Sequence, residues 1–203
     1  MNLRFRTRQS APFSGGRPPR HASSFPDQET AEKLVAHAVE AHAEEVASWL
    51  AGGGRWLVLD ATFDRPSGRS ASERGVEEVS GVRVVLARDA KMPDGFRVHT
   101  CYPQAARSPH TPLPTLRHLV GAYFHQDWDT DYREYPRALD AFLRDSPDLA
   151  TPLVDELAKV RGLSESELDA MLDLLGCQFV LLEGETWHEW LDDLTRRLIT
   201  QRP

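Results

Sequence analysis

The chain has 203 residues, enough for one large domain or two small ones, because domains most often contain about 100–150 residues. Its 40% hydrophobic and 27% charged residues, with a net charge of −7, are typical of a globular protein. No apolar run approaches the roughly 18 residues that a membrane-spanning helix needs. The N-terminus lacks the apolar core of a secretory signal, although an Arg-rich start without acids can also mark a transit peptide. We therefore expect a cytoplasmic protein.

The charge is divided unevenly along the chain. Residues 1–109 contain 15 Lys and Arg against 13 Asp and Glu, whereas residues 110–203 contain 9 against 18. The two halves thus carry about +2 and −9. This division indicates two modules with different partners, the first tolerating polyanions and the second repelling them. A chance difference in surface composition is the alternative.

The chain begins with a segment that has no regular pattern and continues into a helix. Residues 1–26 contain five Arg and four Pro without a hydrophobic period, so we expect an irregular basic segment. Asp27 has the side chain of a helix N-cap, and the apolar residues after it fall on one helical face. The pattern stops at the glycines of positions 52–54 and predicts one long helix.

Strands follow this helix. Residues 55–63, 82–89 and 96–103 are rich in β-branched and aromatic residues. The sequence KMPDG between the last two is a turn that joins antiparallel neighbours. Residues 27–103 are therefore predicted to form an α+β domain that combines a long helix with an antiparallel sheet.

A Pro-rich linker at residues 104–112 separates this domain from a second one at residues 113–203. The apolar pattern beyond the linker is mostly helical. Two predicted helices open with a capping-box sequence, one with Ser164 and Glu167 and the other with Thr186 and Glu189. The second domain is therefore predicted to be all-α or mostly α.

One stretch of the second domain, GAYFHQDWDTDYREY at residues 121–135, alternates acids with aromatic residues. Its three aspartates are Asp127, Asp129 and Asp131. An EF-hand loop counted from Asp127 would need Gly at its sixth position and Glu at its twelfth, but Tyr132 and Ala138 stand there. Three interpretations stay open: a metal site that includes His125, a solvated acidic loop, and a surface that binds a protein.

These segments resemble two bacterial families that are usually encoded side by side. The elements ASSFPD and GFRVHTCYP are similar to the RNase A-like toxin domain of contact-dependent growth inhibition (CDI) effectors. The elements LVGAYFHQDWD, LGCQFV and WHEWLDDL resemble the CdiI immunity protein family, which neutralises such toxins. The resemblance therefore implies an N-terminally truncated RNase A-like α+β domain fused to an immunity domain.

The resemblance also implies which residues would carry ribonuclease chemistry. Such domains are similar to pancreatic-type ribonucleases, which cleave RNA without a metal by using a His, an Arg, and a Thr and a Tyr on a late strand. The Thr-x-Tyr pair corresponds to Thr100 and Tyr102, and Arg6 in LRFRT corresponds to the Arg. No residue matches the acid/base His, which belongs to a helical segment upstream of that Arg.

The strand pattern adds an expectation about this site. On a regularly alternating strand, Thr100 and Tyr102 share one face with Phe96 and Val98, while His99 points to the other face. We therefore expect a degenerate toxin domain with negligible RNA cleavage, because it lacks a group to move the proton of the 2′-hydroxyl.

The sequence thus predicts an immunity protein that binds and occludes an RNase A-like toxin domain, in cis or in trans. The residues expected to bind the toxin combine charge with aromatic anchors: Asp127, Trp128, Asp129, Asp131 and Tyr132. The alternatives are a metal-independent ribonuclease restrained in cis by its own immunity domain, and a relic with no current partner. We expect no cofactor, metal, membrane or DNA, and RNA only if the toxin half is active.

Overall fold

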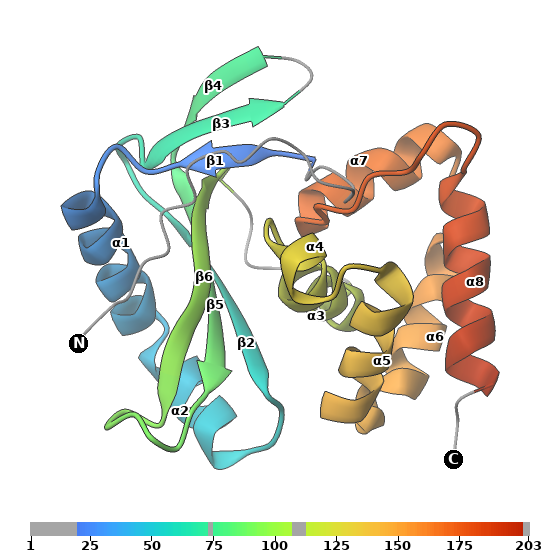
Figure 1. Cartoon of the computed structure of the whole chain (residues 1–203), viewed down its shortest axis with the longest axis horizontal. Helices are drawn as coiled ribbons and strands as arrows, with labels where there is room; N and C mark the ends of the chain where they lie inside the picture. Colours follow the sequence, from blue (N-terminus) through green and yellow to red (C-terminus); the bar gives the residue numbers. More distant parts are fainter. Residues whose placement is uncertain (1–19, 73–74, 107–112, 201–203) are drawn as a thin grey trace. The chain divides into compact units, whose positions relative to one another are not determined.

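The structure is a computed structural model that describes residues 20–72, 75–106 and 113–200. The described residues form two compact units, one from residue 21 to residue 106 and the other from residue 113 to residue 200 together with Arg20 (Figure 1). The first unit combines helices with antiparallel sheets and the second is mostly helical, which confirms the predicted fold classes. No helix within the described ranges is long and apolar enough to cross a membrane.

Two helices, α1 (Gln28–Ala41) and α2 (Ala43–Ala51), occupy the segment where one long helix was expected. Asp27 caps α1, because its carboxylate accepts a hydrogen bond from the backbone N–H of Thr30 at 2.7 Å. The helical run is interrupted at His42, whose ring Nδ1 lies 2.8 Å from the carbonyl oxygen of Ala38. The interruption lets the two helices differ in direction while both bury an apolar side.

The main sheet of the first unit contains three antiparallel strands in the order β2 (Trp56–Thr62), β5 (Gly81–Arg88) and β6 (Phe96–Gln104). These are the three strands that the sequence predicts. Helices α1 and α2 lie on one side of this sheet (Figure 1). Their apolar side chains form one hydrophobic core with that face. Burying that face fixes which side chains are left on the opposite one.

A second sheet has the order β1 (Ala22–Ser24), β3 (Gly68–Ser72) and β4 (Gly75–Val79). It packs closely against the end of β6 at Gly68. A Cβ atom at this position would lie 2.4 Å from the carbonyl oxygen of Ser24 and 2.5 Å from Cγ of Pro103. Only glycine therefore allows this approach of the two sheets.

The second unit is a bundle of short helices: α3 (Pro114–Tyr123), α4 (Trp128–Asp131), α5 (Tyr135–Asp145), α6 (Ala150–Val160), α7 (Glu165–Leu175) and α8 (Trp187–Thr200), with a 3-10 turn at Pro147–Leu149. Both predicted capping boxes are present. The backbone N–H of Ser164 donates to the Glu167 carboxylate at 2.8 Å, and that of Thr186 donates to Glu189 at 3.1 Å. The helix starts were therefore readable from the sequence.

The core of the second unit is aromatic and contains one buried carboxylate. Phe124, Phe179 and Trp190 lie within 5.9 Å of one another, measured between ring centroids. Glu156 of α6 is 5% exposed and accepts hydrogen bonds from the backbone N–H groups of Thr115 and Leu116, at 3.0 and 2.7 Å. This carboxylate satisfies the free donors at the N-terminus of α3 and joins that helix to α6.

The stability of the second unit should fall in mild acid because of His118 on α3. Its ring lies near the rings of Tyr123 and Phe142, at 6.1 and 6.2 Å between centroids. Burial lowers the pKa of His118 to about 4, and Arg117 adds to the effect. The unfolded chain, with a His pKa of about 6.5, then binds more protons, so stability present above that pH is lost as the pH falls toward 4.

We expect the second unit to melt at a lower temperature at about pH 5 than at about pH 7, and His118→Phe to reduce that difference. His188→Gln is the matched control, because the His188 ring donates a hydrogen bond to the Glu165 carboxylate, which raises the pKa of His188 and gives it the opposite pH dependence. Thermal unfolding followed by circular dichroism over this range measures the effect. An unchanged pH dependence in His118→Phe would show that another group is responsible.

Candidate functional site

Strand β6 carries Thr100 and Tyr102, and a β-bulge interrupts its pairing with β5. Val85 pairs with Thr100 on one side of the irregularity, and Leu86 pairs with Val98 on the other. His99 is therefore an extra residue in β6. In a bulge of this kind, the extra residue and the one after it lie opposite a single residue of the partner strand, so the alternation of side chains changes at this point.

The bulge decides which side chains share a face. Phe96 and Val98 pack against the core under α1 and α2. Thr100 and Tyr102 lie beyond the bulge, on the face that these helices do not cover. The expectation that all four side chains share a face, with His99 opposite to Thr100 and Tyr102, is therefore wrong, because it assumed unbroken alternation.

His99 lies on the same face as Thr100 and Tyr102. Its ring centroid is 4.5 Å from that of Trp56, with an angle of 55° between the ring planes. Trp56 begins β2 and alternates with the core-facing Leu57, so its side chain lies on the face away from α1 and α2. The guanidinium of Arg55 lies 4.8 Å from the Trp56 ring centroid. This His, Trp and Arg group was not anticipated from the sequence.

A buried ion pair anchors the same face. Arg83 of β5 donates two hydrogen bonds to Asp60 of β2, each 2.7 Å long, and Gln104 donates a third to Asp60 at 2.7 Å. The Arg83 side chain is fully buried. Burial disfavours its charge, but the Asp60 carboxylate and the Tyr102 hydroxyl outweigh this and raise the pKa of Arg83 above its ordinary value. Because Arg83 is committed to these partners, it is not available to bind a phosphate.

Two arginines, Arg6 and Arg97, are candidates for binding a phosphate. Arg6, which the resemblance assigns to the phosphate, lies outside the described residues. Arg97 pairs with Ala87, two residues before the bulge, and lies on the same face as His99. Its side chain is 44% exposed and 3.9 Å from the Asp89 carboxylate, so its charge is only loosely neutralised.

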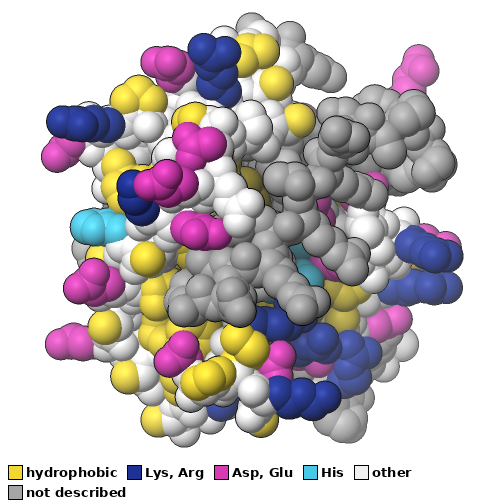
Figure 2. Space-filling model, turned by 60° about the vertical axis from the view of Figure 1, so that its left-hand side comes forward, with side chains coloured by type: hydrophobic (Ala, Val, Ile, Leu, Met, Phe, Trp, Pro, Cys, Tyr) yellow, Lys and Arg dark blue, Asp and Glu magenta, His cyan; other side chains and the backbone are white. Residues whose placement is uncertain are grey.

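In the second unit, the acidic stretch forms the turn around α4. Figure 2, which brings the side of α1 and α2 forward, shows Asp and Glu side chains scattered over that face, so acidic side chains are not confined to this turn. Here a fully buried imidazole organises the turn: His125 Nδ1 accepts from the backbone N–H of Asp127 at 3.2 Å, and His125 Nε2 lies 3.3 Å from the Asp131 carboxylate. Asp129 is half-buried and Asp131 is exposed.

The two aromatic residues of this stretch differ in position. Trp128 is 1% exposed and packs against Phe124 and Phe179, so it belongs to the core. Tyr132 is half-buried, and its ring stacks on Tyr123 at 6.0 Å. Tyr132 and the acids, rather than Trp128, are therefore the members of the stretch that a partner can reach.

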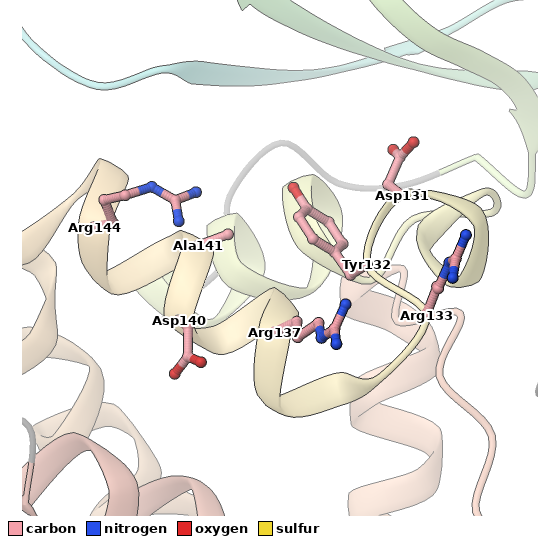
Figure 3. Close-up of a pocket in the computed structure, with 7 residues that line it drawn as sticks. All are labelled: Asp131, Tyr132, Arg133, Arg137, Asp140, Ala141 and Arg144. Atoms are coloured by element: carbon pink, nitrogen blue, oxygen red, sulfur yellow. The ribbon is translucent and has the colours of Figure 1, made fainter.

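A pocket of about 420 Å³ adjoins the acidic turn and is lined by Asp131, Tyr132, Arg133, Arg137, Asp140, Ala141 and Arg144. Figure 3 shows the Asp140 side chain pointing away from Tyr132, on the other side of α5. Within the described residues, no side-chain partner neutralises Arg133 or Arg137. Arg133 also has φ 66°, a left-handed conformation that costs a non-glycine residue about 1–3 kcal/mol. Arg133, Arg137 and Arg144 form a basic patch beside the acids of the turn.

Comparison with known families separates the chain into the same two parts. Residues 11–103 match the family described as bacterial CdiA-CT RNAse A domain, and residues 112–198 match the family described as CdiI immunity protein. The chain joins a CdiA-CT RNase A domain to a CdiI immunity domain. A crystal structure of a CdiA-CT/CdiI complex from Y. kristensenii is 34% identical over 42% of this chain and 78% of that chain, with a TM-score of 0.41. No curated protein matches.

The buried pair should be essential for the stability of the RNase A domain. Arg83→Met would remove the guanidinium that pairs with the buried Asp60 carboxylate, so we expect a loss of about 3–5 kcal/mol in the free energy of unfolding. The double variant Asp60→Leu/Arg83→Met removes both charges and should recover much of this loss. Urea unfolding of the full chain measures both changes.

Arg65→Met is the matched control, because Arg65 is an exposed arginine of the same domain. We expect it to change the free energy of unfolding by less than about 0.5 kcal/mol. Equal effects of Arg83→Met and Arg65→Met would contradict a structural role for the buried pair.

Proposed function

We propose that the immunity domain binds a CdiA-CT RNase A domain, in cis or in trans, and occludes its RNA site. The observation that carries this proposal is charge, because residues 110–203 hold 18 Asp and Glu against 9 Lys and Arg. A site that binds RNA presents positive potential, and an acidic protein surface competes for it. A cytoplasmic location, where RNA and an incoming toxin would meet, fits this function.

The turn around α4 is the surface that we assign to this contact. Asp127, Asp129 and Asp131 supply negative charge, and Tyr132 supplies an aromatic side chain of the kind that anchors protein interfaces. Trp128 contributes indirectly, since its burial holds α4 in place. Because the turn is already ordered, these groups lose less conformational entropy when they bind a partner.

The basic patch beside the turn gives the surface an orientation. Arg133, Arg137 and Arg144 lie on the pocket next to Asp131. A partner that presents a basic group to the acids and an acidic group to the arginines would fit in one orientation only. Placing charges of both signs side by side in this way favours specificity over affinity.

A second function, ribonuclease activity restrained in cis, is favoured by the position of His99. The bulge places an imidazole on the face of Thr100 and Tyr102, where the sequence had given no acid/base group. Because the inhibitor is covalently joined, its local concentration reaches about the millimolar range when the linker spans the two sites. Binding and restraint would then be two aspects of one arrangement.

The immunity function is tested with a fragment of residues 110–203, whose folding is first checked by circular dichroism. We expect this fragment to inhibit RNA cleavage by a catalytically intact CdiA-CT RNase A domain. The triple variant Asp127→Asn/Asp129→Asn/Asp131→Asn should associate about ten-fold more slowly at low salt, because it loses electrostatic steering. The difference should shrink at about 1 M salt, where charges are screened.

The matched control removes three other carboxylates of the same domain, as Asp155→Asn/Glu183→Gln/Asp192→Asn. This variant has the same net charge as the triple variant but an intact turn, so we expect most of the association rate to be kept. Association rates measured by stopped-flow fluorescence compare the two. A folded fragment that inhibits none of several related toxins would refute the immunity function.

A further inference from the structure

We propose that His99 is the acid/base residue of the RNase A domain, the group that accepts the proton of a ribose 2′-hydroxyl. The proposal rests on the second function given above. Its basis is the bulge, which brings His99 and Thr100 together opposite Val85. Two adjacent residues of one strand, an imidazole and a hydroxyl, therefore lie on the same face.

The other histidines on described helices of this domain are placed elsewhere. His37 lies on α1, with its ring 5.4 Å from that of Phe63, and His42 is held by the carbonyl oxygen of Ala38. Both belong to the helical layer that covers the opposite face of the sheet. His99 shares both the strand and the face of Thr100 and Tyr102.

The surroundings of His99 suit a proton-transfer group. The ring is half-buried, so it is accessible, and its contact with Trp56 limits its rotation. Arg55 lies over Trp56 and Arg97 lies two residues away on the same strand, so cationic groups stand near the imidazole. Such groups stabilise the negative charge that builds up on a phosphate during cleavage.

The reaction that this arrangement supports is a transfer within the RNA. The 2′-oxygen forms a bond to phosphorus while the bond from phosphorus to the 5′-oxygen breaks, which gives a 2′,3′-cyclic phosphate. His99 takes the proton of the 2′-hydroxyl, and water supplies a proton to the departing 5′-oxygen. The Thr100 hydroxyl is placed to donate a hydrogen bond to a phosphate oxygen. Tyr102, two residues further along β6, is held beside Arg83.

The experiment uses the full chain with a protease site inserted after Ala106. The folded protein is cut, the two halves are separated at high salt, and circular dichroism checks that the front half stays folded. Cleavage of an RNA dinucleotide with EDTA present is then followed for the released front half and for the uncut chain. We expect the front half to cleave RNA, and His99→Gln to lower its rate by about 10²–10⁴-fold.

His37→Gln is the matched control and should leave the rate unchanged. In His99→Ala, added imidazole should restore part of the rate, which a purely structural role of His99 would not allow. Cleavage that His99→Gln leaves intact would overturn the proposal while keeping the ribonuclease function. Absence of cleavage from both the front half and the uncut chain would overturn the role of His99 and the ribonuclease function together. An active front half that the immunity domain fails to inhibit would refute only the immunity function.

Discussion

The ion pair between Asp60 and Arg83 fixes the central sheet of the RNase A domain. Both groups are removed from water, so their charges are tolerated only while the two hydrogen bonds between them, each 2.7 Å long, are kept. A slip of one residue between β2 and β5 would turn Arg83 toward the hydrophobic core under α1 and α2. The pair therefore holds the register of the strands, and Tyr102, opposite Arg83 on β6, takes its position from it.

The bulge at His99 lies between two parts of β6 that are each held in place by different contacts. On one side of the bulge, β6 is bound by the packing of Phe96 and Val98 against the helices, and on the other by Tyr102 beside Arg83. The extra residue allows both parts of β6 to keep these contacts at the same time. It also leaves an imidazole on the face that the helices do not cover, which connects the packing of the domain with the chemistry we propose for it.

The elements that depend on local pattern could be predicted from the sequence. The three strands of the main sheet, the cap at Asp27 and both capping boxes follow from residue type and spacing. The bulge could not be predicted, because it depends on how many residues of β6 oppose β5, and HTCY carries no sign of it. Trp128 was expected to bind the toxin. Its burial could not be predicted, because the aromatic cluster that buries it includes Phe179, about fifty residues away. Strands β3 and β4 were not predicted either, because they lack the hydrophobic alternation of a buried strand.

The most direct test of the account is the side of the sheet on which His99 lies. Nuclear Overhauser effects from its ring protons can be measured in the isotopically labelled full chain. With the ring centroids 4.5 Å apart, we expect cross-peaks between His99 and the indole of Trp56. Cross-peaks from His99 to Trp49 or Val46 on α2, with none to Trp56, would place His99 in the helical core and contradict the account.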